Sequence, residues 1–146
     1  MTATRKSVTG AILVAAACLG LWGALAQAQV AQPIATVELS GVIVLRVRDA
    51  GPWATVYARA DEIYKRLNEA INELGDELSP DRVQVETVGG LPAVTVGGHL
   101  IVTVTPVDAR LNGTTPDRLA RIWASNLKKA FQRFLEIHRP ARPPVF

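Results

Sequence analysis

Residues 93–138 place the strongest constraint on what this chain can fold into. Two runs of alternating β-branched residues flank Gly-Gly-His at residues 97–99, a pattern typical of a β-hairpin. Thr115 and Pro116 then predict the start of a helix, because threonine can cap a helix and proline suits its first position. Apolar residues recur at helical spacing from there to residue 135. The stretch therefore predicts a hairpin that leads into one long amphipathic helix, closed at residues 139–140 by Arg-Pro.

Residues 37–47 predict an earlier hairpin around Ser40-Gly41. A three-residue loop over residues 40–42 would keep the apolar side chains of both strands on one side. The resulting pairs are Leu39–Ile43 and Val37–Leu45. In this register the core-facing residues are Val37, Leu39, Ile43, Leu45 and Val47, and the outward-facing ones are Glu38, Val44, Arg46 and Arg48.

The second hairpin is expected to follow the same rule, after a strand over residues 82–86 and a turn at Gly89-Gly90. A three-residue loop over residues 97–99 would again collect the valines on one face. The expected pairs are Val96–Leu100 and Val94–Val102, with Val104 on the same side and Thr95, Ile101 and Thr103 on the other.

A first helix is expected between the two hairpins, with Pro52 in its opening turn and Gly75 as its stop. Its apolar stripe is Val56, Ala60, Ile63, Leu67, Ala70/Ile71 and Leu74. Arg59 is expected among the polar residues outside that stripe, together with Glu62, Lys65, Arg66, Glu69 and Glu73.

The element order is therefore β-β-α-β-β-β-α, with one further helical turn at residues 107–111 before the last helix. Antiparallel hairpins with one wet face, covered by helices on the other, are typical of an α+β domain. We expect a two-layer sandwich of mostly antiparallel sheet with two helices packed on one face, over residues 36–138.

The N-terminus has the pattern of a signal peptide over residues 1–28. Arg5 and Lys6 precede an apolar run over residues 11–26, and small residues at positions 26 and 28 fit signal peptidase. We expect cleavage after Ala28, with cleavage after Ala26 as the alternative. A linker over residues 29–35, a domain in the periplasm or secreted, and a Pro-rich tail over residues 139–146 are expected to follow. The alternative is an uncleaved N-terminal helix that anchors the chain in the membrane, because no charge interrupts residues 7–37.

Charge and cysteine content limit the classes of function. The formal net charge is +3, and Arg5 and Lys6 account for two of these charges, so removal of the leader leaves a nearly neutral domain. A neutral domain has no bulk field for nucleic acid, and we expect no nucleic-acid partner. The one cysteine, Cys18, lies in the leader, so the domain has no thiol for a disulfide or a metal.

The remaining reactive side chains form no catalytic pattern. His99 is expected at a hairpin tip and His138 at a helix end, and neither has a second ligand at a metal-binding spacing. Asn112-Gly113-Thr114 matches a glycosylation sequon, but Asn-Gly turn chemistry explains it. We expect no catalytic residue, no cofactor and no metal, and so no enzyme.

The last helix carries the one electrostatic feature of the sequence. Its basic residues outnumber its acidic ones, Asp117 and Glu136. A solvated helix face is the ordinary interpretation, and contact with anionic lipid is the functional one. The candidate contact residues are Arg118, Arg121, Lys128, Lys129 and Arg133.

Residues 99–131 also resemble a known sequence pattern. They are similar to the exported N-terminal domain of bacterial, cyanobacterial-type mechanosensitive channel proteins of the small-conductance family. The matching positions are Thr103-Val104-Thr105, Asp108-Ala109, Gly113-Thr114, Leu119-Ala120 and Trp123-Ala124, and residues 37–48 and 58–74 resemble that domain's opening hairpin and first helix.

The resemblance implies a non-catalytic accessory or sensory domain outside the cytoplasm. In the channels, membrane helices and a pore follow this domain, whereas the present sequence ends at Phe146, so ion conduction is not expected of it. The partners that this reading implies are an envelope membrane protein or a second copy of the chain, with anionic lipid as the alternative.

Overall fold

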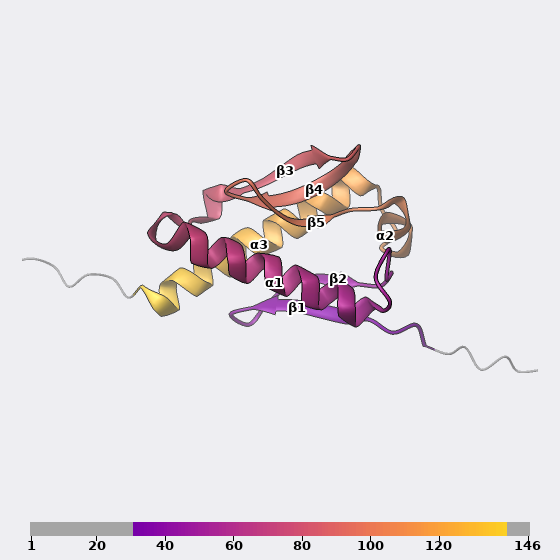
Figure 1. Cartoon of the computed structure of the whole chain (residues 1–146), viewed down its shortest axis with the longest axis horizontal. Coiled ribbons are helices and arrows are strands. Elements are labelled where there is room, and N and C mark those ends of the chain that lie inside the picture. Colours follow the sequence, from indigo (N-terminus) through magenta and orange to yellow (C-terminus); the bar gives the residue numbers. More distant parts are fainter. Residues whose placement is uncertain (1–30, 140–146) are drawn as a thin grey trace, which may run out of the picture. The chain divides into compact units, whose positions relative to one another are not determined.

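Residues 31–139 are the part of the chain that the computed structural model describes, and they contain two β-sheets and three α-helices (Figure 1). The expected leader, and the tail beyond Arg139, lie outside the described residues. The elements are β1 (Ala35–Leu39), β2 (Val42–Val47), α1 (Val56–Leu74), β3 (Val83–Val88), β4 (Leu91–Val96), β5 (His99–Thr103), α2 (Pro106–Leu111) and α3 (Pro116–His138).

The α+β class and the order of the elements are confirmed, including the helical turn that becomes α2. The strands form two separate antiparallel sheets, β1-β2 and β3-β4-β5, where we had expected one. Both long helices run between the sheets in Figure 1, α1 against β1 and β5, and α3 against β2 and β4. The helices therefore share one core with both sheets instead of covering one face of a single sheet.

The first hairpin differs from the expected register at its tip. Val37 pairs with Leu45 as predicted, but Leu39 pairs with Val42, so the loop has two residues, Ser40-Gly41, both with positive φ. A β-bulge absorbs the extra residue of β2. As a result Val44 points into the core with 2% of its surface exposed, whereas Ile43 points outward with 39% exposed.

The β4–β5 hairpin repeats this construction. Val94 pairs with Val102 as predicted, but Val96 pairs with His99 across the two-residue turn Gly97-Gly98. A bulge follows here too, and it places Ile101 in the core, where we had expected it on the opposite side from the valines. Both hairpins thus use a tight turn and a bulge to bury two adjacent apolar residues of the returning strand.

Helix α1 begins later than expected and buries one residue that we had placed outside its apolar stripe. Thr55 caps it by accepting a hydrogen bond from the Ala58 amide at 3.0 Å, so Pro52 precedes the helix and is not in its first turn. The helix ends at Gly75 as predicted. Arg59 is 2% exposed and belongs to the buried face.

Helix α3 follows the prediction closely. Thr115 caps it, Pro116 is its first residue, and it ends at His138. Ile122 departs from the expected stripe, because 43% of its surface is exposed. Neither α3 nor any other helix of residues 31–139 has an apolar run long enough to cross a membrane. The core-facing side of α3 consists of Leu119, Ala120, Trp123, Ala124, Leu127, Ala130 and Phe131.

Candidate functional site

The basic residues of α3 all lie on its solvent side. The apolar stripe faces the core, and helical periodicity turns the cations away from it. None of the five Arg and Lys side chains of α3 forms an ion pair with another residue of the described chain. We call this surface the basic face of α3; its residues are Arg118, Arg121, Lys128, Lys129 and Arg133, and each is exposed.

Strand β2 adds two arginines next to this face. The strand lies against α3; Arg46 is exposed between the buried Leu45 and Val47, and Arg48, the first residue after the strand, is half-buried. Neither arginine has an ionic partner within residues 31–139. Sequence reasoning had placed both on the outer face of the hairpin, but could not bring them to α3, because that contact joins segments far apart in the chain.

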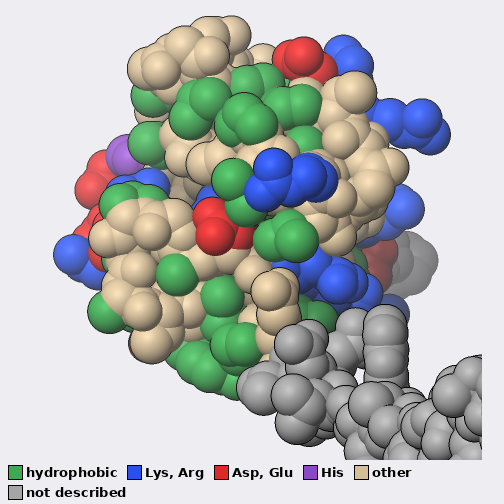
Figure 2. All heavy atoms as spheres, turned by 90° about the vertical axis from the view of Figure 1, so that its right-hand side faces the viewer, with side chains coloured by type: hydrophobic (Ala, Val, Ile, Leu, Met, Phe, Trp, Pro, Cys, Tyr) green, Lys and Arg blue, Asp and Glu red, His purple; other side chains and the backbone are tan. Residues whose placement is uncertain are grey.

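A groove of about 420 Å³ separates β2 from the first half of α3. Its size lies within the range of about 300–1,000 Å³ that is usual for small-ligand sites. We call it the β2–α3 groove. Figure 2 shows the molecule from the end nearest α2, where Lys and Arg side chains project along the right-hand edge. The groove is lined by Ile43, Val44, Leu45, Arg46, Arg48, Asn112, Gly113, Thr114, Arg118, Leu119, Ile122, Trp123 and Asn126.

Two polar side chains, Asn126 and Arg48, are notable in the lining of the β2–α3 groove. The Nδ2 of Asn126 on α3 donates a hydrogen bond to the main-chain carbonyl of Val44 at 3.1 Å, which ties the two walls together. The Nε of Arg48 is buried and has no hydrogen-bond partner among the described residues. A buried donor without a partner is uncommon, because it forfeits its hydration without compensation.

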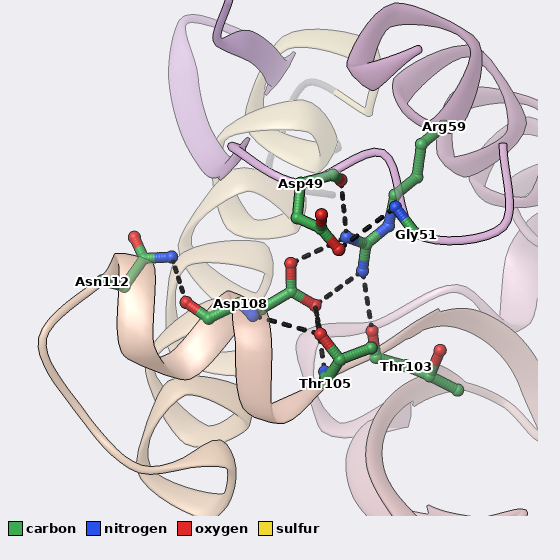
Figure 3. A network of polar contacts seen from close by, with 7 residues as sticks. All are labelled: Asp49, Gly51, Arg59, Thr103, Thr105, Asp108 and Asn112. Atoms are coloured by element: carbon green, nitrogen blue, oxygen red, sulfur yellow. Dashed lines mark hydrogen bonds and ion pairs between the residues drawn. The ribbon is translucent and has the colours of Figure 1, made fainter. Parts of the chain in front are cut away.

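A buried ion pair lies next to Asn112, which lines the groove; Figure 3 shows the pair and its polar contacts. The Nη1 and Nη2 of Arg59 donate to Oδ1 and Oδ2 of Asp108, each at 2.7 Å, and both side chains are almost completely buried. Nη1 also reaches the Asp49 carbonyl at 2.9 Å, and Nη2 reaches the Thr103 carbonyl at 3.1 Å. The guanidinium therefore joins α1 to α2, to the end of β5 and to the segment that follows β2.

Asp108 has a second role as a capping residue of α2. Its Oδ2 accepts hydrogen bonds from the Thr105 amide at 2.9 Å and the Thr105 hydroxyl at 3.0 Å, while the Thr105 hydroxyl accepts one from the Asp108 amide. The amide group of Asn112 donates to the Asp108 carbonyl at 2.8 Å. The loop that closes the groove at residues 112–114 is thus attached to the buried ion pair, as Figure 3 shows for Asn112.

Sequence reasoning missed this network, although two signals for it were present. Arg59 is three residues after Val56 and four before Ile63, so it falls on the buried face of α1. Thr105 and Asp108 have the spacing of a capping box. Arg59 and Asp108 carry opposite charges, and a buried charge needs a partner, so the two signals together indicate an ion pair between them.

A smaller hollow of about 260 Å³ lies on the other side of α3, against β3. Arg121 and Lys128 line it together with Gln84, Val85 and Ser125. The basic face of α3 therefore has the β2–α3 groove along one side, where Arg118 is a lining residue, and this smaller hollow along the other.

The two histidines lie apart and take part in local contacts. His99 Nε2 is 3.3 Å from a carboxylate oxygen of Glu73 at the hairpin tip. His138 stacks on Phe134, with ring centroids 4.2 Å apart, and its Nδ1 lies 2.8 Å from the Phe134 carbonyl. Within residues 31–139 no three His, Cys, Asp or Glu side chains come together as a metal site would require.

The fold and this surface define a small α+β domain with an unpaired basic face beside a groove. The chain matches the model of a family described as a domain of unknown function, DUF8459, over residues 36–134, and it belongs to that family. No curated protein and no solved structure matches the chain.

Proposed function

We propose that this chain is a non-catalytic domain that works outside the cytoplasm and docks, through the basic face of α3, on an acidic surface of an envelope membrane protein. The observation that carries the proposal is the presence of seven basic side chains without ionic partners among the described residues, five on α3, one on β2 and one directly after β2. Residues 31–139 contain equal numbers of acidic and basic side chains, so this gathering is a matter of arrangement and not of composition.

The physical argument starts from the repulsion between these cations. Like charges that lie near one another destabilise the folded chain slightly, whereas neighbouring charges of opposite sign attract. A complementary acidic surface removes the repulsion and steers the partners together, an effect that salt weakens. The exposed acidic residues include three on α1, namely Asp61, Glu69 and Glu73, so the domain presents charges of opposite sign on different elements.

Location outside the cytoplasm is supported by the leader pattern over residues 1–28. An accessory or sensory role is supported by the resemblance to the exported domain of mechanosensitive channel proteins. In this proposal the partner is a membrane protein of that kind or of a related envelope assembly.

A second candidate is direct binding to anionic lipid. The observation that favours it is the length of α3, 23 residues with cations from its first turn to its last third. However, the apolar side of α3 is buried in the core, and interfacial helices normally insert that side into the bilayer. Lipid binding would then rest on charge alone, at about 1 kcal/mol for each cation near the surface.

Sedimentation of the full chain with envelope membranes of the cell that makes it tests the proposal. We expect binding to the membranes to weaken as the salt concentration rises. Binding should be lost when protease has digested the proteins on the membrane face turned away from the cytoplasm. Binding to protein-free vesicles of phosphatidylglycerol and phosphatidylcholine should be weak. The variant Arg121→Glu/Lys128→Glu/Lys129→Glu should lose binding, whereas Lys65→Glu on α1 should keep it. Equal binding to the vesicles would replace the protein partner with lipid, and binding by neither would refute both candidates.

A further inference from the structure

We infer that the β2–α3 groove is a binding site for an acidic peptide segment in extended conformation, which adds a strand to the free edge of β2. This inference rests on the proposed docking function and specifies the part of the partner that is recognised. It is carried by three separate features of the groove: a strand edge, unpaired arginines on both walls, and exposed isoleucines at the rim.

The strand edge supplies main-chain recognition. β2 pairs with β1 on one side only, because its sheet has two strands. No main-chain group of residues 42–47 bonds to a main-chain group outside that pair within the described chain, and the Val44 carbonyl accepts one side-chain hydrogen bond, from Asn126. Six residues at about 3.3 Å each give an edge of about 20 Å, enough for a short peptide strand. Such an edge beside a helix binds extended peptides by strand addition.

The arginines determine the charge of the occupant. Arg46 and Arg48 project from the strand, and Arg118 projects from the helix on the opposite wall. A guanidinium binds a carboxylate through two parallel hydrogen bonds, a geometry that lysine cannot provide. Arg46 and Arg118 are exposed and have no ionic partner within the described residues, so their guanidinium donors are open to a carboxylate in the groove. An acidic ligand therefore satisfies donors that the domain leaves open.

The exposed isoleucines indicate that the occupant also carries apolar side chains. Ile43 and Ile122 belong to opposite walls and expose 39% and 43% of their surfaces. An extended segment that carries apolar as well as acidic residues can cover the isoleucines while its carboxylates meet the arginines. A lone anion such as phosphate would leave the isoleucines uncovered.

The groove is also held in place before anything binds. Asn126 fixes the helix wall to Val44 of the strand wall. The Arg59–Asp108 pair fixes the closing loop through Asn112 and fixes the segment after β2 through the Asp49 carbonyl. A site that is rigid in the free protein loses less conformational entropy on binding, so it can bind a short peptide more tightly.

The test uses an acetylated and amidated octapeptide of alternating Glu and Val as the probe, titrated into the ¹⁵N-labelled full chain. We expect saturable amide shifts in residues 42–48 and 118–126. The same peptide with Lys in place of Glu should bind at least tenfold more weakly, and so should a peptide with N-methylated main-chain amides, because strand addition needs those donors. Comparable binding by the N-methylated peptide would contradict strand addition.

Matched charge reversals locate the site. Arg118→Glu should weaken the octapeptide at least tenfold while keeping the domain folded, because a glutamate three residues after the Thr115 cap completes a capping box. Arg48→Glu should have the same effect, with circular dichroism as the check on folding. Lys129→Glu lies on α3 outside the groove and should change affinity by less than threefold. Equal losses from Arg118→Glu and Lys129→Glu would mean diffuse charge attraction and no groove site.

The outcome also separates this inference from the proposed function. If the octapeptide fails to bind but membrane docking still depends on Arg121, Lys128 and Lys129, the peptide site is wrong and the docking function stands. If phosphatidylglycerol vesicles shift the groove residues and the octapeptide does not, the occupant is a lipid headgroup and the peptide site is refuted.

Discussion

Arg59 and Asp108 are joined by two hydrogen bonds of 2.7 Å while 2% and 1% of their surfaces are exposed. The pair lies where α1, α2 and the ends of two strands meet, and each partner has further hydrogen bonds to main-chain or hydroxyl groups. The Arg59 guanidinium also lies 5.7 Å from the ring centroid of Trp53, within the range of a cation–π contact. One buried ion pair thus ties α1 to α2, to the end of β5 and to the segment that follows β2.

Removal of one member of this pair should destabilise the domain far more than removal of a surface pair. Asp108→Ala leaves a buried guanidinium without its counter-charge and removes the α2 cap, so we expect a loss of about 3–5 kcal/mol in the free energy of unfolding. Glu62→Ala breaks the half-buried Glu62–Arg66 pair within one helix and should cost less than about 1 kcal/mol. Urea unfolding measures both, and equal losses would contradict the assigned role.

The bulge in β2 makes a second prediction, which compares neighbouring residues. Val44→Thr places a hydroxyl in the core without an expected partner and should lower the free energy of unfolding by about 1–3 kcal/mol. Ile43→Thr changes a residue that is 39% exposed and should have a smaller effect. The three-residue loop expected from the sequence would reverse this order, so denaturant titration of the two variants distinguishes the registers.

The order of elements was predictable because each has a strong local signal. Alternating valines, Gly-Gly turns and the Thr-Pro helix start need no knowledge of the rest of the chain. The bulges were missed because a three-residue loop and a two-residue turn with a bulge give the same Val37–Leu45 pair. Only the packing of Val44 against the core separates the two registers.

The candidate site was predictable in part for a similar reason. Helical periodicity alone identifies the exposed cations of α3, and all five are exposed as that periodicity requires. Arg46, Arg48 and the groove depend on the contact between β2 and α3, which no local pattern reveals. Arg59 was assigned to the polar surface because a charged residue is seldom buried unless it is paired, and its partner is 49 residues away.

The turn between β4 and β5 makes a third prediction. Gly97 has a φ of +56°, and a Cβ there would lie 2.8 Å from a methyl carbon of Leu74, so Gly97→Ala combines backbone strain with a steric clash. Gly89 has a φ of +59° with open space around it, so Gly89→Ala carries the strain alone. Gly97→Ala should be less stable than Gly89→Ala by about 1–3 kcal/mol in chemical denaturation. Equal stabilities would show that Leu74 moves aside freely.

The unpaired basic face makes the last prediction, which concerns the stability of the free domain. Lys129 and Arg133 are one helical turn apart, so they repel, and Lys129→Glu replaces this repulsion with an attractive pair in the favoured orientation. We expect a gain of about 0.5–1 kcal/mol in the free energy of unfolding at low salt, which disappears in 1 M NaCl. Lys65→Glu is the matched control, because Lys65 has Asp61 and Glu69 one turn away on α1, and there the same substitution should lower stability. Thermal unfolding of both variants at two salt concentrations measures the difference.

The same variant also tests what Lys129 is for. If the surface were selected for stability alone, glutamate would be favoured at residue 129. A gain in stability on Lys129→Glu together with weaker membrane docking would therefore indicate that the lysine serves binding. A loss of stability on Lys129→Glu would mean that the cations of α3 are balanced by groups on its own surface, and the argument for an acidic partner would fail.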